Sequence, residues 1–152
     1  MIRDCEALRL LVLPGLASEG RDWAIPAAAV AEIVRGEAPI PPSPAAPAWS
    51  IGYRDWRGIR VPAVRLGAPG RRETAYLTVC LGATADPAVP FFALETPRLP
   101  RLERVGAEDL AEDADPGERE FVLAWMRLRG RPLALADLER IERALCDLGR
   151  GD

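Results

Sequence analysis

The chain has 152 residues, a length typical of one domain or of two small ones that share a core. Its apolar fraction of 49% and charged fraction of 28% are those of a globular protein and exclude a disordered one. The net charge is −3, so the chain lacks the basic surplus that binds nucleic acid.

The sequence contains no histidine, lysine, asparagine or glutamine, and all 20 basic residues are arginine. Without histidine there are no Ser-His or Cys-His nucleophile pairs and no imidazole metal sites. Without lysine there are no Schiff bases and no Walker-type phosphate loops. A carboxylate pair could still act as acid and base, and a thiolate could still attack, but with these chemistries removed we expect that the protein is not an enzyme.

The cysteines do not indicate a metal or redox site, because no two of them have a CxxC spacing. They are Cys5, Cys80 and Cys146. We expect reduced thiols, some of them packed in the core, in a cytoplasmic protein without a metal or other cofactor. The apolar run Leu10–Leu13 is too short to cross a membrane, and the acidic Asp4 and Glu6 do not fit a signal peptide.

The first part of the chain is predicted to be rich in strands. The run Leu8–Leu13 predicts a buried strand, and a loop follows it. Residues 23–25 and 30–34 have strand character on either side of Pro26. Residues 27–34 could also form a short helix, because alanine favours one.

A hairpin is predicted next, after a proline-rich connector over residues 38–48 that takes a fixed path across the surface. Apolar residues alternate with polar or small ones at the start of Trp49–Leu66, as in a half-buried strand. Arg57 and Gly58 form the turn, with the glycine supplying a positive φ. Pro62 cannot donate a ladder hydrogen bond, so we expect the return strand to lie at a sheet edge there.

The same pattern recurs 72 residues later, near 121–138. The offset superposes Trp49 on Phe121, Ile51 on Leu123, Tyr53 on Trp125, and Arg57-Gly58 on Arg129-Gly130. The repeat predicts two related β subdomains within a single domain, residues 1–152, each built around one hairpin. The segments 74–81 and 89–94 between them are also β-rich.

One helix is predicted near the C-terminus, with Asp137 as its N-cap and Gly149 as its stop. Its apolar face is formed by Leu138, Ile141, Leu145 and Leu148, with charged residues, Glu142 among them, mostly elsewhere. The acidic run Glu108–Asp115 is interpreted as a solvated loop or short helical turn.

Several motifs follow one another between residues 23 and 66. They are Ile25-Pro26, Val30 with Glu32 and Ile33, the connector Pro39–Pro47, Trp49 with Gly52, Arg57-Gly58, and Val61-Pro62-Ala63-Val64-Arg65-Leu66. In this order they resemble the CheW family of chemotaxis coupling proteins. That family shows an aliphatic-Pro strand, a Val-x-Glu-Ile segment, a proline connector, an Arg-Gly turn and a Val-Pro-x-Val-x-Leu strand.

The resemblance is weaker in the second half of the chain. Phe91–Glu95 stands where the family has a strand that ends in an acidic stretch, although Glu95-Thr96 replaces its usual Asp-Glu pair. Residues 121–141 are similar to the family's closing hairpin, with Ala136 in place of its leucine. The pair Asp55-Trp56 is similar to the ChpC branch, accessory CheW-like proteins of type IV pilus chemosensory systems.

The resemblance implies a mainly β fold of two intertwined, five-stranded SH3-like barrels around a shared core, with a short C-terminal helix. It also implies a non-catalytic adaptor whose partners are a CheA-type histidine kinase and the cytoplasmic tip of a chemoreceptor. Such an adaptor would lie in the cytoplasm, at receptor arrays on the inner face of the membrane. It would not insert into the membrane.

By resemblance, receptor contact involves the first hairpin and the strand before it. The residues expected to contact the receptor are Arg57, Gly58 and Gly52, together with Val30 and Glu32 of the strand Val30–Glu32. We expect Arg57 to donate to a receptor carboxylate or carbonyl. The residues alone favour the alternative, an exposed turn arginine without a partner. Trp56 is either buried beneath the turn or exposed as an apolar anchor. The family's kinase contact uses a hydrophobic surface between barrel strands, which the sequence does not place.

Two other classes of function stay open. The divergent second half favours a CheW-like scaffold that has lost receptor or kinase coupling and binds another partner. An acid/base enzyme would need two carboxylates at a fixed separation, one with a raised pKa, from the set Asp109, Glu112, Asp113 and Asp115. Cys80 has no histidine or lysine to lower its pKa and is expected to be buried and inert.

Overall fold

The computed structural model describes residues 8–15, 19–36, 38–67, 76–84, 88–114, 117 and 119–150. Its first strands are β1 (Leu8–Leu13), β2 (Asp22–Pro26), β3 (Val30–Arg35), β4 (Ser50–Trp56), β5 (Ile59–Val64), β6 (Tyr76–Leu81) and β7 (Phe91–Thr96), with the 3-10 helix η2 (Ala27–Ala29) between β2 and β3. They are followed by β8 (Arg101–Val105), η3 (Ala107–Asp109), β9 (Leu110–Glu112), β10 (Val122–Leu128), β11 (Arg131–Ala136) and α1 (Leu138–Arg150). The expected mainly β fold with one C-terminal helix is confirmed.

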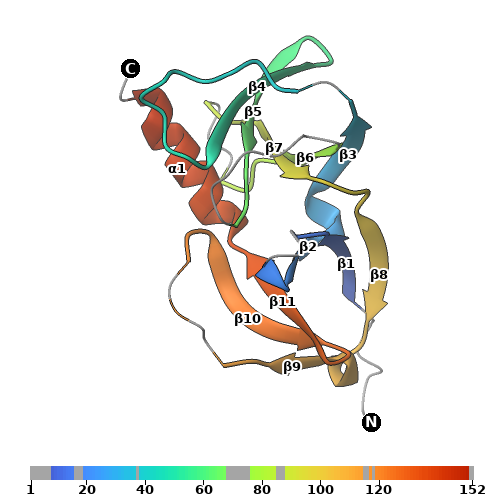
Figure 1. Cartoon of the computed structure of the whole chain (residues 1–152). Helices are drawn as coiled ribbons and strands as arrows, with labels where there is room; N and C mark the ends of the chain where they lie inside the picture. The colour runs from blue at the N-terminus through green and yellow to red at the C-terminus, as the bar shows by residue number, and fades with distance from the viewer. Residues whose placement is uncertain are drawn as a thin grey trace.

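The strands form two sheets, which we call the first and second barrel. The first barrel has five strands in the order β3-β6-β7-β5-β4, and the second has six in the order β8-β1-β2-β11-β10-β9. Figure 1 shows them one above the other, with α1 running from their junction along the side of the first barrel. The sixth strand corrects an expectation, because β9 lies inside the acidic run that was interpreted as loop or helical turn.

The two barrels are interlaced, because β1 and β2 come from the start of the chain but belong to the second barrel. Strand β2 pairs in parallel with β11, and β5 pairs in parallel with β7. All other strand pairs among the described residues are antiparallel. The 3-10 turn η2 joins the two barrels between β2 and β3.

The two predicted hairpins are present with the same geometry. Arg57 and Gly58 have φ values of 49° and 76°, and Arg129 and Gly130 have 48° and 81°. Two successive positive φ values match the twist of a two-residue hairpin, so the arginine shares the left-handed backbone that was assigned to glycine alone. The registers of the hairpins also slip at equivalent places, between Ser50 and Gly52 and between positions 122 and 124.

Strand β5 does not lie at a sheet edge, which corrects the inference from its proline. It is flanked by β4 and β7. Its pairing with β7 covers Ala63 and Val64, directly after Pro62. The proline therefore precedes the part of the strand that is paired on both sides, where a missing N–H would interrupt the ladder.

The core is shared by both barrels and the helix. One cluster joins buried residues of both sheets to α1, among them Leu11, Leu13, Trp23, Ile25, Val64, Cys80, Phe92, Leu94, Phe121, Ile141 and Leu145. Each barrel adds a smaller interior cluster: Val61, Ala63, Leu77, Val79 and Ala93 in the first, and Leu10, Val12, Ala24, Val105, Leu128 and Leu133 in the second. Burial of this apolar surface is the main source of stability.

Helix α1 begins where the sequence predicts and extends one residue beyond Gly149. The Asp137 carboxylate accepts a hydrogen bond from the backbone N–H of Arg140 across 3.0 Å, which is the expected N-cap. The prediction was wrong for Glu142, which is fully buried. Its carboxylate accepts hydrogen bonds from the N–H of Ala83 at 2.6 Å and the hydroxyl of Thr84 at 2.5 Å, and so fixes the start of the β6–β7 loop on the helix.

Cys80 and Cys146 are both buried, in agreement with the expectation that some of the cysteines are packed in the core. Burial raises the pKa of Cys80 from 9.0 to about 12. Cys5 lies outside the described residues. None of the helices in the described part of the chain has the length and apolar character that crossing a membrane requires.

Candidate partner-binding site

The candidate site lies where the two edges of the first barrel meet. Strands β3 and β4 are at opposite ends of the strand order. Even so, the indole Nε1 of Trp56 on β4 donates a hydrogen bond to Oε2 of Glu32 on β3 across 2.5 Å. The sheet therefore curls until its edge strands are joined by a side-chain contact.

Arg57 follows Trp56 and extends the contact to the surface. Its Nη2 lies 3.5 Å from Oε2 of Glu32, and its guanidinium carbon lies 4.9 Å from the centre of the Trp56 ring. The Arg57 side chain is 69% exposed. An ion pair this exposed adds little to stability, so the contact orients the guanidinium while most of its donors still face solvent.

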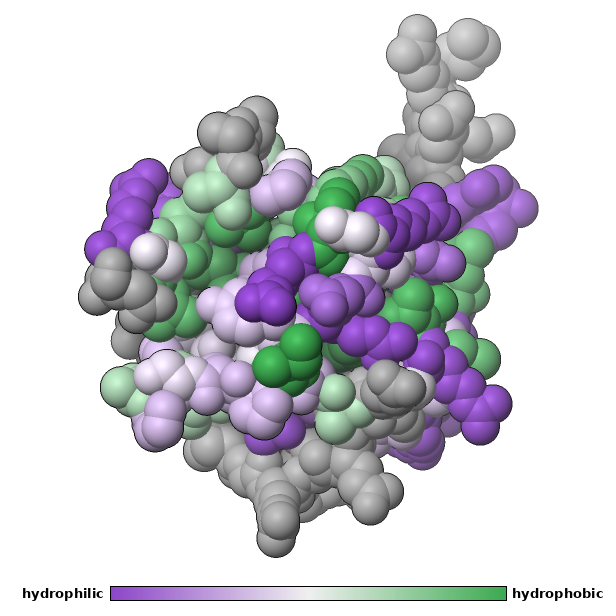
Figure 2. Space-filling view, turned by 90° about the horizontal axis from the view of Figure 1, so that it is seen from above, coloured by the Kyte–Doolittle hydropathy of each residue, from purple (hydrophilic) through white to green (hydrophobic). Residues whose placement is uncertain are grey.

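Trp56 is half-buried, between the two alternatives that the sequence left open. Its ring packs edge to face against Phe91, with centroids 5.0 Å apart. Strand pairing places Ile59 opposite Trp56 and Leu81 opposite Phe91. Ile59 and Leu81 are 37% and 44% exposed, so this end of the first barrel is apolar beside the arginine. Figure 2 views the molecule from above Figure 1 and shows hydrophobic residues interrupted by strongly hydrophilic ones.

Gly58 lies beside this cluster, at the tip of the hairpin, and nothing lies within 4 Å of the position its Cβ would take. Gly52 is buried instead. A Cβ there would lie 1.7 Å from the carbonyl oxygen of Ile40, which accepts a hydrogen bond from the N–H of Tyr53. Gly52 therefore lets the connector dock on β4.

Val30 also lies outside the cluster. It is packed against the shared core and stands opposite Cys80 in the pairing of β3 with β6. Of the six predicted residues, the structure thus brings together Glu32, Trp56, Arg57 and Gly58. Phe91 on β7 and Leu81 on β6 were missed, because these strands are distant in sequence and only strand pairing shows their proximity. Ile59 was missed although it lies in the same hairpin, because it was assigned to the return strand alone.

The acidic position of β7 is internal. The Glu95 carboxylate is fully buried and accepts hydrogen bonds from Arg65, with Nε 2.7 Å from Oε1 and Nη2 3.3 Å from Oε2. Such a two-pronged pair fixes the end of β5 to β7. Glu95 holds the barrel together and does not form part of the exposed site.

The carboxylates considered for acid/base catalysis have structural partners. Asp109 lies 3.4 Å from Nη2 of Arg129 and accepts a hydrogen bond from the N–H of Gly106. Burial raises the pKa of Asp113, but hydrogen bonds from Ala114 and Arg127 together lower it by more, so the net shift of the pKa is downward. That direction is opposite to what a general acid needs. Asp115 lies outside the described residues.

The described ranges also hold no cluster of three or more cysteine and acidic side chains that could bind a metal ion. Glu112, the remaining carboxylate of the considered set, is exposed at the end of β9. Cys80 is buried, with its thiol 3.7 Å from the carbonyl oxygen of Thr78, and its raised pKa keeps it protonated at neutral pH.

The chain is similar to one protein family over part of its length and to a solved structure over most of it. Residues 15–79 match the model of the CheW-like domain. The solved structure of the scaffolding protein TtCheW from Thermoanaerobacter tengcongensis is similar, with a TM-score of 0.66, 14% identity, and coverage of 91% of this chain and 89% of that one. No curated protein matches the sequence. Residues 15–79 are thus similar to the CheW-like domain, and the fold of the chain is similar to that of TtCheW.

Proposed function

We propose that the protein is a non-catalytic adaptor that couples chemoreceptors to a CheA-type histidine kinase. It would act in the cytoplasm, at receptor arrays on the inner face of the membrane. The family match and the fold shared with a scaffolding protein support the adaptor class. The observation that carries the receptor contact is the exposed guanidinium of Arg57, oriented by Glu32 and stacked on Trp56.

The chemistry of this cluster suits a protein surface. Arg57 offers several N–H donors to a carboxylate or carbonyl of the receptor tip. Ile59 and Leu81 supply apolar area beside it. An arginine guanidinium next to aromatic and other apolar side chains is typical of the residues that dominate binding at protein interfaces. Gly58 leaves the hairpin tip open, so a partner can approach the backbone there.

The test is a binding titration of the purified protein against a receptor cytoplasmic tip and, separately, a CheA-type kinase. The variant Arg57→Glu should weaken receptor binding about tenfold or more, since one hydrogen-bonded charge is worth about 1.5–3 kcal/mol. Kinase binding should be unchanged. The control is Arg143→Glu on α1, where a side chain that is 67% exposed undergoes the same charge reversal far along the chain.

A divergent scaffold that has lost coupling is the second candidate. The observation in its favour is that the family match ends at residue 79, before most of the second barrel. If a folded, monodisperse sample binds neither partner, this candidate replaces the coupler. If both partners bind and Arg57→Glu has no effect, coupling stands and the receptor contact lies elsewhere.

A finer proposal is that the protein belongs to a pilus-linked chemosensory system, the ChpC branch. It rests on the pair Asp55-Trp56, whose tryptophan joins β4 to β3. Titration against kinases from pilus and flagellar systems tests it directly. Tighter binding to the pilus kinase is expected, and a preference for the flagellar kinase would contradict the assignment.

A further inference from the structure

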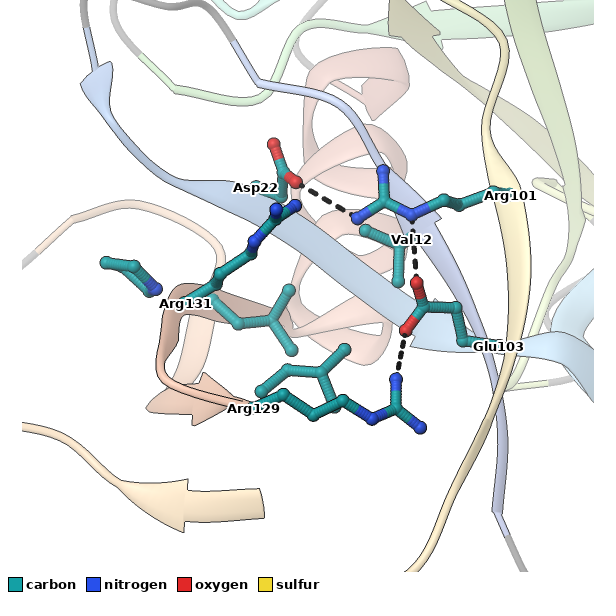
Figure 3. Close-up of a pocket in the computed structure, with 9 residues that line it drawn as sticks. Val12, Asp22, Arg101, Glu103, Arg129 and Arg131 are labelled. Atoms are coloured by element: carbon teal, nitrogen blue, oxygen red, sulfur yellow. Dashed lines mark hydrogen bonds and ion pairs between the residues drawn. The ribbon is translucent and has the colours of Figure 1, made fainter. Parts of the chain in front are cut away.

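A pocket of about 290 Å³ opens at the end of the second barrel, at the opposite end of the molecule from the first hairpin (Figures 1 and 3). Its lining comes from five strands and the second hairpin turn: Val12, Asp22, Arg101, Glu103, Leu128, Arg129, Arg131, Pro132 and Leu133. The volume is just below the range of about 300–1,000 Å³ that small-molecule sites occupy, so the pocket suits only a small ligand.

The pocket combines an apolar wall with a charged one. Val12, Leu128 and Leu133 belong to the interior cluster of the second barrel. Across from them, charged side chains form a chain of contacts: Asp22 to Arg101 at 3.5 Å, Arg101 to Glu103 at 2.9 Å, and Glu103 to Arg129 at 3.0 Å (Figure 3).

Arg131 also lines the pocket, but it does not take part in this chain of ion pairs. Figure 3 shows its side chain extending toward the pocket from the start of β11. It makes no ion pair with any residue that the structure describes. Arg101 and Arg129 are each paired with carboxylates, Arg129 also with Asp109 outside the lining, whereas Arg131 has no such partner among the described residues.

Comparison of the two barrels explains why this one is hollow. The hairpins share turn geometry and register, so residues 72 apart occupy equivalent places. Trp56, which packs against Phe91 at the end of the first barrel, corresponds to the smaller Leu128 in the second. Exposed Ile59 corresponds to Arg131. At the end of the first barrel, Trp56 and Ile59 are apolar and Trp56 packs against Phe91. At the equivalent end of the second barrel, a smaller leucine and the cation Arg131 leave the pocket open.

We propose that this pocket binds an apolar carboxylate, with its hydrocarbon part against Leu128 and Leu133 and its carboxylate on Arg131. Two sources have this chemistry: a free branched-chain acid, and the C-terminal residue of a peptide that ends in an aliphatic side chain. In either case the guanidinium receives the anion that the pocket lacks. The site is independent of the receptor contact, which lies on the other barrel.

The experiment is an NMR titration of the ¹⁵N-labelled full chain. The probes are 4-methylpentanoate and its neutral amide, and the peptide acetyl-Gly-Gly-Leu with a free or amidated C-terminus. Shifts are expected at the amides of Val12, Glu103 and Arg131, with the acid forms binding at least about tenfold more tightly than the amides. The free acid and the free peptide distinguish the two sources.

Variants borrowed from the first barrel make the test specific. Arg131→Ile installs the residue found at the equivalent exposed place and should weaken acid binding about tenfold. Leu128→Trp should fill the pocket and abolish binding. Arg60→Ile on the first hairpin, whose side chain is 64% exposed, is the control and should bind as wild type.

Three results would overturn the proposal: no shifts at the pocket amides with either acid, equal affinity for acid and amide, or wild-type affinity in a folded Arg131→Ile variant. None of them bears on receptor coupling, because Arg131→Ile should leave the Arg57-dependent titration unchanged. Conversely, Arg57→Glu should leave acid binding unchanged. The failure of one proposal is therefore distinguishable from the failure of the other.

Discussion

Trp49 and Phe121 occupy equivalent places at the start of the two hairpins, and they touch each other. Their rings meet edge to face, with centroids 5.3 Å apart and planes at 83°. Phe121 belongs to the shared core, and Trp49 is packed against that core. Equivalent residues of the two hairpins are therefore in direct contact at the junction of the barrels.

A double-mutant cycle should detect this contact. Phe121 is 3% exposed, so Phe121→Ala should reduce the free energy of unfolding by about 3–5 kcal/mol, and Trp49→Ala by less because Trp49 is only partly buried. The coupling energy expected for the pair is about 0.5–1.5 kcal/mol. Urea unfolding of the four proteins measures it, and strictly additive losses would show that the rings do not interact.

Two glycines in the first hairpin should respond differently to the same substitution. Gly52→Ala adds a methyl group 1.7 Å from the Ile40 carbonyl oxygen, at a φ of +116°, and should cost about 3–5 kcal/mol. Gly58→Ala meets nothing within 4 Å, and its φ of +76° should cost about 1–2 kcal/mol. Thermal unfolding compares them, and equal losses would contradict the docking of the connector on Gly52.

The buried carboxylate of Glu142 should be sensitive to a change that preserves its size. In Glu142→Gln the amide group accepts at one atom only, so the N–H groups of Ala83 and Thr84 compete for it. The expected loss is about 1.5–3 kcal/mol, with faster hydrogen exchange at those two amides. Glu139→Gln, one turn away and 62% exposed, is the control and should change stability by less than about 0.5 kcal/mol.

The raised pKa of the buried Cys80 thiol leads us to expect that the protein loses stability at alkaline pH. Its pKa is about 12 when folded and 9.0 when unfolded, so the folded state holds the proton more strongly. The stabilisation is fully present below pH 9 and decreases by about 1.4 kcal/mol per pH unit between pH 9 and about 12. Urea unfolding from pH 8 to 10.5 should show this slope, and Cys80→Ala should flatten it. An unchanged slope in the variant would assign the alkaline loss to other groups.

The sequence predicted those features that depend on residues close together in the chain. The apolar run Leu8–Leu13 became a strand with the same bounds, and Asp137 caps the helix because an N-cap acts within three residues. The offset of 72 between the hairpins was visible as a pattern and proved to extend to turn conformation and register slip.

Contacts between distant strands could not be predicted in this way. The hydrogen bond from Trp56 to Glu32 spans 24 residues and exists only because the sheet curls until its edges meet. Glu142 looked like a surface residue, since its loop partner lies 58 residues away in the sequence. Strand β9 is short and acidic, and only its pairing with β10 makes it a strand.

The interlacing of the barrels has a consequence for the order in which the chain can fold during synthesis. Every strand of the first barrel lies between residues 30 and 96, so this barrel can close once that stretch has left the ribosome. Strands β1 and β2 emerge earlier but must wait for β8 and β11, their neighbours in the finished sheet. We expect limited proteolysis of nascent chains, stalled far enough beyond β7 for residue 96 to have left the ribosome, to spare the β3–β7 segment and to cut before β3.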